Sequence, residues 1–366
     1  MNTEEKIKLI TRNCQEVLTE EDLKVLIESG KEIRHYIGLE ISGMVHLGTG
    51  LITMGKIADF LKAGATCRVF LADFHTFLNN KLGGKWEDIR WASEHYFKEA
   101  LIASMKCYGL KGDEVEFISG DDLYKSHPEH WQNFMEVGKQ VTLSRNLRSI
   151  SIMGKKLGAD VNMATLFYPP LQVADIVTMD INLAHAGMDQ RKAHVIARDA
   201  IKKIPGDHQT PIAIHQNLIA GLTAPEAGAN DEESLKMSKS KPGSAVFVHD
   251  TPDEIRNKIK KAYGPPKETE FNPLLNWVKT LVFWGEALRP AQGFKIERPE
   301  KFGGNVTYTK YADVVADYAS EKLYPTDLKN ALAEWLIEKL APARAHFEIP
   351  ENKEALVKMK GLLGIF

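Results

Sequence analysis

The chain has 366 residues, of which 26% are charged and 43% hydrophobic, and its formal net charge is −2. This length allows two domains with cores of their own, and the composition is that of an ordinary globular protein. The sequence excludes a membrane-spanning or disulfide-stapled class, because no run approaches the roughly 20 apolar residues of a span and the three cysteines are widely spaced.

Apolar runs alternate with helical patterns through the first two thirds of the chain, which predicts a parallel sheet with crossover helices. Ligands of such open sheets bind beyond the carboxyl ends of the strands, so the polar residues that follow each run are candidates: Glu40, Asp73, His75 and Asp121. The expected strands are 36–40, 68–72, 115–118 and 211–214, and the expected helices are 47–63, with Gly64 as its C-cap, and 94–108.

Further along, a helical stretch from about 131 to 194 is longer than one crossover needs, which predicts an insertion at about 121–187. A linker rich in Gly, Ala, Ser and charge follows, and then a helix that Thr251 and Glu254 start as a capping box. We therefore expect an α/β, Rossmann-like doubly wound parallel sheet with a helical insertion and a mainly helical C-terminal domain. The expected bounds are 1–225 for the catalytic domain, 226–262 for the linker and 263–366 for the C-terminal domain.

The segment His46-Leu47-Gly48-Thr49 follows an apolar strand candidate and opens a helical pattern. It therefore places an imidazole, a glycine and a hydroxyl at a helix N-terminus. Backbone N–H groups and the helix dipole favour phosphate at such a position. A histidine and a glycine at a turn are also common for structural reasons.

The segment Lys236-Met237-Ser238-Lys239-Ser240 puts two ammonium groups and two hydroxyls on a small-residue loop. Such a loop can close over a triphosphate and stabilise the pyrophosphate as it leaves. Taken alone, the loop could be merely solvated. Its order and separation relative to His46 favour a shared role in ATP chemistry.

Tyr168, Gln172 and Asp175 are spaced i, i+4 and i+7, so on a helix they share one face. Apolar neighbours flank this polar stripe, and its burial is costly without a ligand or partners. The alternative is a stripe that faces solvent.

Together these segments resemble the tyrosyl-tRNA synthetase family of the archaeal and eukaryotic type, within the class I aminoacyl-tRNA synthetases. The resemblance covers nearly the whole chain. One departure is Thr49, which stands where the family's HIGH signature has its second histidine, so His46 is expected to do more of the phosphate work. The segments that carry the resemblance are 46–49, 168–176, 187–192, 236–240, 301–304 and 325–330.

The resemblance implies roles for individual residues. Tyr36 and Asp175 match positions that bind the phenol hydroxyl of tyrosine, Tyr168, Gln172 and Gln190 match those that hold its ammonium group, and Glu40 falls on a further pocket position. For ATP, the matching residues are His46, Gly48, Thr49, Lys236, Ser238, Lys239 and Ser240. For tRNA, Arg148, Arg191 and Lys192 match contacts to the acceptor end, while Phe302, Tyr324 and Asp327 match contacts to the first anticodon base.

The resemblance thus implies a tyrosine–tRNA ligase that activates L-tyrosine with ATP and Mg²⁺ and transfers it to the 3′-terminal adenosine of tRNA(Tyr). No tightly bound cofactor and no metal site are expected. The family's homodimers form through the inserted segment, so we expect a homodimer. The scattered cysteines and the polar N-terminal segment predict a cytoplasmic protein without a membrane partner.

Three alternatives share part of this pattern. A tryptophanyl enzyme has both ATP segments, although Tyr36 and Asp175 suit a phenol better than an indole. A small-metabolite nucleotidylyltransferase shares the first turn but does not need about a hundred further residues that carry Phe302 and Asp327. A catalytically silent RNA-binding paralogue would not need His46, Lys236 and Lys239.

Overall fold

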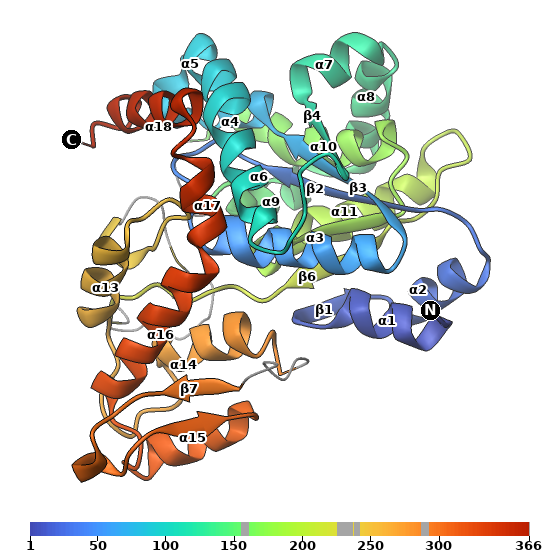
Figure 1. Cartoon of the computed structure of the whole chain (residues 1–366). Helices are drawn as coiled ribbons and strands as arrows, with labels where there is room; N and C mark the ends of the chain where they lie inside the picture. Colours follow the sequence, from blue (N-terminus) through green and yellow to red (C-terminus); the bar gives the residue numbers. More distant parts are fainter. Residues whose placement is uncertain (155–160, 225–236, 238–241, 287–292, 366) are drawn as a thin grey trace.

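A six-stranded sheet forms the centre of the molecule in the computed structural model, which describes residues 1–154, 161–224, 237, 242–286 and 293–365 (Figure 1). The strand order is β1-β6-β5-β2-β3-β4; all neighbours are parallel except β1, which is antiparallel to β6. The strands are β1 Cys14–Leu18, β2 Ile33–Leu39, β3 Ala65–Leu71, β4 Val115–Ser119, β5 Leu183–Gly187 and β6 Ile212–Gln216.

This architecture confirms the expected α/β class, with two corrections to its elements. The edge strand β1 was not predicted, because Cys14–Leu18 is short and half-buried and lacks clear alternation. The strand β5 falls within the stretch that was assigned to the helical insertion. Its sequence, Leu-Ala-His-Ala-Gly, contains no β-branched or aromatic residue, so propensity gave no strand signal, and burial in the middle of the sheet decides its conformation.

The two faces of the sheet carry different cores. Alternate residues of a strand point to opposite faces. Accordingly, Ile37 and Val69 pack into the larger core with helices α3 (Thr53–Lys62) and α6 (Lys98–Lys106). Their neighbours Tyr36 and Phe70 pack on the other face with α10 (Met163–Thr178) and α11 (Arg191–Ala200). Helices on both faces are what a doubly wound sheet requires.

The expected helix 47–63 is present as a π-helical turn, η1 (Gly48–Ile52), that continues into α3, and Gly64 follows with a φ of +89°. The expected helix 94–108 is likewise η3 (Ala92–Phe97) joined to α6. The remaining helices before residue 225 are α1 Thr3–Thr11, α2 Glu20–Glu28, α4 Asp73–Leu78, α5 Trp86–Trp91, α7 Gly120–Ser126, α8 His130–Gln140 and α9 Leu143–Ser149, with the short turns η2 Lys81–Gly84, η4 Ile150–Met153, η5 Met188–Gln190 and η6 Ile201–Lys203.

The C-terminal third is mainly helical, as expected, with one short antiparallel pair, β7 (Phe294–Ile296) and β8 (Val306–Tyr308). The predicted capping box is present: the Thr251 hydroxyl accepts from the Glu254 N–H and the Glu254 carboxylate accepts from the Thr251 N–H. The elements are η7 Pro242–Ser244, α13 Pro252–Lys260, α14 Pro273–Trp277, η8 Val278–Val282, η9 Glu300–Phe302, α15 Tyr311–Ala319, α16 Pro325–Lys339, α17 Ala341–His346 and α18 Pro350–Leu362.

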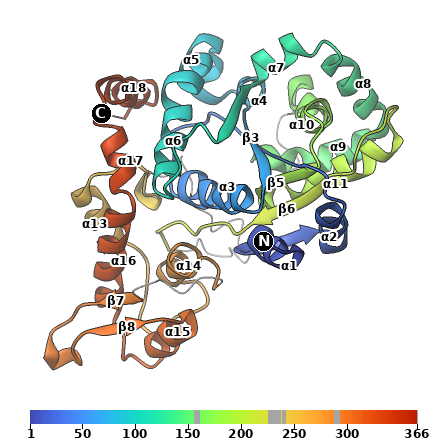
Figure 2. The same ribbon diagram turned by 45° about the vertical axis from the view of Figure 1, so that its right-hand side comes forward.

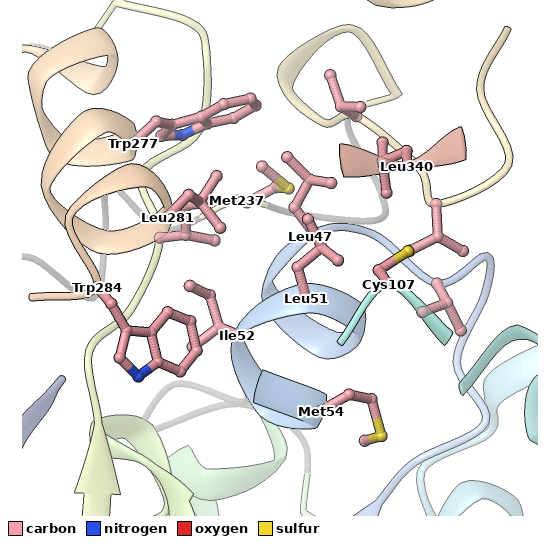
Figure 3. Packing of buried hydrophobic residues seen from close by; sticks show 14 of the residues in the cluster. Leu47, Leu51, Ile52, Met54, Cys107, Met237, Trp277, Leu281, Trp284 and Leu340 are labelled. Carbon is pink, nitrogen blue, oxygen red and sulfur yellow. The ribbon is translucent and has the colours of Figure 1, made fainter. Parts of the chain in front are cut away.

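In both ribbon views, β7, β8 and α15 lie at the opposite end of the molecule from α7 and α8 (Figure 2). The C-terminal part and the domain around the sheet share a continuous apolar core, in which Trp277, Leu281 and Trp284 face Leu51 and Ile52 at the start of the α3 segment (Figure 3). Within the described ranges, no helix is long and apolar enough to cross a membrane.

Candidate active site

A cavity of about 510 Å³ lies at the carboxyl ends of β2, β3, β5 and β6. The chain order of the strands reverses between β2 and β5, and open α/β sheets bind their ligands at such a switch point. Asp175 lies next to this cavity and is fully buried. Eight of the residues predicted for tyrosine and ATP line the cavity: Tyr36, Glu40, His46, Gly48, Thr49, Tyr168, Gln172 and Gln190.

The His46 side chain folds back over the turn that it begins. Its Nδ1 atom accepts from the Gly48 N–H at 3.0 Å and from the Thr49 N–H at 3.4 Å. A neutral imidazole that accepts at Nδ1 carries its proton at Nε2. Gly48 is required here, because a Cβ would lie 2.9 Å from the His46 ring and from Ile219. The His46 side chain therefore caps this turn through Nδ1.

A buried polar network supports the turn from below. The Thr53 hydroxyl donates to the Gly48 carbonyl at 3.1 Å and accepts from the Gln216 amide at 3.1 Å. The Gln216 carbonyl pairs with His185 at 3.0 Å, and His185 pairs with His35 at 3.3 Å. Burial lowers the pKa of His35 to about 3, so the imidazoles of this network stay neutral. The network fixes the position of the turn in the cavity wall.

Of the second ATP segment, the structure describes Met237, which lies beside this turn. Met237 is buried and its N–H donates to the Ile219 carbonyl at 2.8 Å. After the loop, Leu47 donates to Val246 at 3.1 Å and Val248 donates to Val45 at 3.1 Å. The predicted residues Lys236, Ser238, Lys239 and Ser240 lie outside the described residues. The described residues Met237 and Val246 are thereby held by backbone hydrogen bonds beside the His46 turn.

Tyr168, Gln172 and Asp175 lie on one face of α10, as their spacing predicts. The helix contains two prolines, and Pro170 has no N–H to donate to the Leu166 carbonyl. The Asn146 side chain donates to that carbonyl at 2.7 Å instead, so the helix continues past the prolines. Because all three residues of the stripe are buried, the alternative of a solvent-facing stripe is wrong.

Asp175 has an unusual environment at the inner end of the stripe. Its Oδ1 atom accepts from the Tyr124 hydroxyl at 2.8 Å, whereas Oδ2 has no hydrogen-bond partner in the described part of the chain. The nearest imidazole nitrogen, His75 Nε2, lies 3.6 Å from Oδ2, and burial lowers the pKa of His75 to about 3. A buried acceptor without a donor is costly, so a ligand donor is expected here.

Burial also raises the pKa of Asp175 well above the usual value for aspartate, and the hydrogen bond from Tyr124 acts in the opposite direction. The carboxyl group is therefore harder to ionise than a solvated one, because the neighbouring His75 is neutral and Asp73 adds a like charge. Tyr36 lies beside it, and its hydroxyl occupies the space that a Cβ on Gly38 would need.

The other end of the stripe is polar and partly open. The Tyr168 hydroxyl donates to Glu40 Oε1 at 3.0 Å, and the Asn79 amide donates to the same atom at 2.7 Å. Gln190 donates to the Ile152 carbonyl at 2.9 Å, while the buried Gln172 Oε1 atom has no partner among the described residues. A carboxylate and a free amide oxygen form a suitable acceptor set for an ammonium group.

Arg148, Arg191 and Lys192 line a second cavity of about 450 Å³, which Arg145 also borders. Arg191 is held by Glu16 of β1 through contacts of 2.7 to 3.0 Å, and these bonds lower the pKa of Glu16. Lys192 donates to Ser151 at 2.8 Å. The structure therefore brings the three predicted acceptor-end residues together and adds Glu16, which the sequence gave no reason to select.

The three predicted anticodon residues lie in the C-terminal part. Phe302 and Tyr324 are large aromatic side chains that are about half exposed, and Asp327 lies in the first turn of α16. Arg298 connects the two loops, because its guanidinium donates to the Gly304 carbonyl at 2.6 Å and to the Lys322 carbonyl at 2.5 Å. Exposed aromatic rings on linked loops form a surface on which a base can stack.

Sequence reasoning missed part of the site. Gln216, the last residue of β6, and Asn217 after it line the cavity, where the rule applied to the other strands would have found them. Tyr124 has no sequence signal, because it reaches Asp175 from a separate short helix. Of the four residues flagged after strands, Glu40 and His75 line the cavity. Asp73 instead binds Arg90 and the Asp121 N–H, which is a structural role.

Comparison with known proteins identifies the family. The model for class I tRNA synthetases (W and Y) matches residues 28–341. The chain belongs to this family. The tyrosine–tRNA ligases of Pyrococcus furiosus and Thermococcus sibiricus are 47% and 46% identical to this class I synthetase, with 99% of each chain covered.

Solved structures agree with this assignment. The tyrosyl-tRNA synthetase of Pyrococcus horikoshii, complexed with L-tyrosine, matches this class I synthetase with a TM-score of 0.92 at 45% identity, over 99% of this chain and 100% of that chain. The tryptophanyl-tRNA synthetase of Aeropyrum pernix shares the fold with a TM-score of 0.68 at 18% identity, over 93% of this chain and 84% of that chain.

Proposed function

We propose that the chain is a tyrosine–tRNA ligase. The carboxylate of tyrosine attacks the α-phosphate of ATP, pyrophosphate leaves, and the tyrosyl group then passes from the adenylate to the 3′-terminal adenosine of tRNA(Tyr). The full-length identity of 46 to 47% to tyrosine–tRNA ligases supports this proposal.

The observation that supports the choice of amino acid is the Oδ2 atom of Asp175, which has no partner among the described residues and lies beside the Tyr36 hydroxyl. Both lie at the buried end of the α10 stripe, whose open end offers Glu40 and Gln172 to an ammonium group. A phenol hydroxyl can donate to Asp175 and accept from Tyr36 at once. An indole N–H can only donate, so tryptophan would leave the Tyr36 hydroxyl unpaired.

Catalysis needs no covalent nucleophile from the protein, because positioning and charge stabilisation suffice for attack on a phosphate. His46 is placed to donate from Nε2 to a phosphate oxygen, and Thr49 adds a hydroxyl to the same wall. Lys236 and Lys239 supply positive charge to the triphosphate. Mg²⁺ arrives with ATP and is held mainly by its phosphates.

We assign the parts of the chain to the two ends of tRNA. Residues 1–225 form the catalytic domain, with the inserted helices at about 121–182, before β5; the loop linker is 226–262, and 263–366 bind the anticodon. The basic cavity at Arg148, Arg191 and Lys192 receives the acceptor end, while Phe302, Tyr324 and Asp327 take the first anticodon base. The acceptor-end cavity lies on α9 and α11, and both ribbon views place these helices away from β7, β8 and α15, which suits a ligand as long as tRNA.

We also propose a homodimer through the inserted helices. Helices α8 and α10 pack together, and their outer surfaces and α9 expose large apolar side chains, namely Trp131, Met135, Leu143, Met163 and Phe167. Such a patch is unusual on a monomer. Met135→Glu with Met163→Glu should convert a dimer to monomers in light scattering, whereas Val357→Glu on α18, which is equally exposed, should not. A parent protein that is monomeric would contradict the proposal.

We place the protein in the cytoplasm, where tRNA charging supplies translation and where its three unpaired cysteines stay reduced. The function is tested by charging a tRNA(Tyr) transcript with labelled tyrosine, using a tRNA(Trp) transcript with tryptophan as control. Charging of tRNA(Tyr) alone is expected. Preferential charging of tRNA(Trp) would favour the tryptophanyl alternative, and no charging of either would favour a silent RNA-binding protein.

A further inference from the structure

Tyr124 connects the helix α7 to the phenol-binding aspartate. Its hydroxyl donates to Asp175 Oδ1 at 2.8 Å, and both side chains are buried. The helix starts at a defined place, because the Ser119 hydroxyl accepts from the Asp122 N–H at 3.1 Å as an N-cap. The donor that Asp175 receives therefore comes from a separate and well-anchored element.

The Tyr124 ring is held in one orientation from several sides. It stacks on His130 of α8 with a centroid distance of 3.9 Å and an interplanar angle of 17°. Phe74 lies 4.9 Å away on another side, and Trp131 meets the ring edge-on at 5.4 Å. His130 is itself paired with the Thr178 hydroxyl at 3.0 Å. The hydroxyl of Tyr124 therefore has little freedom to leave Asp175.

This arrangement determines which oxygen of Asp175 remains for a ligand. Because Oδ1 is occupied by Tyr124, the atom without a partner among the described residues is Oδ2. His75 Nε2 and His130 Nε2 lie 3.6 and 3.9 Å from the carboxyl oxygens, beyond hydrogen-bond distance. Without the Tyr124 hydroxyl, no donor in the described part of the chain would select one rotation of the carboxyl group.

We propose that Tyr124 is a positioning residue for substrate selection: it holds Asp175 through Oδ1 so that Oδ2 faces the phenol hydroxyl of the bound tyrosine. This inference rests on the proposed function and extends it. Tyr124 acts through Asp175 and does not touch the reacting atoms. The stack on His130 extends the same support to α8, the helix that carries part of the proposed dimer surface.

The test compares Tyr124→Phe with Tyr318→Phe in pyrophosphate exchange with tyrosine and with phenylalanine. Tyr318 is a matched control, because it is a buried tyrosine in the C-terminal part. Its substitution by phenylalanine also removes one hydrogen bond, which the Tyr318 hydroxyl donates to the Pro265 carbonyl at 3.0 Å. For Tyr124→Phe the KM for tyrosine should rise and the tyrosine-to-phenylalanine ratio of kcat/KM should fall about tenfold, the usual effect of one hydrogen bond to a carboxylate. The kcat at saturating tyrosine should stay close to the parent value.

A pH profile separates positioning from a merely structural effect. The groups that face Asp175 are Tyr36 from β2, Asp73 and His75 from α4, Tyr124 from α7 and His130 from α8. Since the Tyr124 hydrogen bond lowers the pKa of Asp175, its loss should move the acid limb of the tyrosine KM profile to higher pH. Tyr318→Phe should leave that limb unchanged.

A double-mutant cycle with Asp175→Asn completes the test. If Tyr124 acts through Asp175, its substitution should change the tyrosine-to-phenylalanine ratio far less in the Asp175→Asn background than in the parent. An unchanged ratio in Tyr124→Phe, or an equal loss in both backgrounds, would overturn the positioning role while leaving the proposed function intact. A parent protein without tyrosine-dependent exchange would overturn both.

Discussion

Substitution of His46 by asparagine separates two roles that the structure gives to one side chain. The imidazole Nδ1 atom caps the turn by accepting from the Gly48 and Thr49 N–H groups. Its Nε2–H is the proposed donor to ATP. An asparagine Oδ1 atom reaches the position of Nδ1 and is among the best N-cap acceptors, but asparagine is too short to replace Nε2.

The expected loss follows from one missing hydrogen bond to a phosphate. Such a bond to a charged group contributes about 1.5 to 3 kcal/mol. If it forms in the transition state, the rate of adenylate formation should fall by a factor of about 10 to 150. Stability should change little, since the cap remains. His46→Ala removes the cap as well and should lose about 1 kcal/mol of unfolding free energy in addition.

The assay is single-turnover adenylate formation at saturating ATP and tyrosine, together with thermal unfolding of the three proteins. Both variants should lose kcat equally with the KM for tyrosine unchanged, and only His46→Ala should melt earlier. If His46→Asn retains the parent rate, Nε2 does not serve phosphate. If His46→Asn melts as early as His46→Ala, the capping geometry is not what stabilises the turn.

Three further predictions address the pocket, the C-terminal part and acid stability. Asp175→Ala should weaken tyrosine activation and narrow its preference over phenylalanine in the exchange assay; an undiminished preference would refute the pocket assignment. Asp327→Ala should impair tRNA charging but leave exchange intact, whereas equal losses would indicate a structural role. The free energy of unfolding should fall from pH 6.5 downward, because burial lowers the pKa of His194 and His249 to about 3, so they stay neutral in the fold while they charge in the unfolded chain. Below pH 6.5 each of these histidines lowers the free energy of unfolding by about 1.4 kcal/mol per pH unit. His249→Phe should therefore weaken the pH dependence of the unfolding free energy, measured by denaturant titration. An unchanged pH dependence would contradict this reasoning.

Much of the fold follows from local patterns that the physics makes reliable. The capping box at Thr251 and Glu254 and the short, mostly buried strands at 33–39 and 212–216, each with two isoleucines, satisfy local rules. The strands β1 and β5 could not be predicted in this way. Their residues have weak strand propensity, and the neighbouring strands determine their pairing.

The residues of the candidate site likewise include some that local patterns predict and others that they do not. Tyr168, Gln172 and Asp175 were predictable because a helix repeats every 3.6 residues, and His46 because a turn followed a strand. Tyr124 and Glu16 were not, because each reaches its partner from an element more than fifty residues away in the chain. Contacts of this kind depend on how elements pack, and no local pattern encodes them.

The central claim, that the cavity selects tyrosine, is tested most directly by ATP–pyrophosphate exchange with each of the twenty amino acids. The account predicts the highest kcat/KM for tyrosine, with phenylalanine and tryptophan far lower, because only a phenol pairs with both Asp175 and Tyr36. Exchange that is fastest with another amino acid, or none with any, would contradict it.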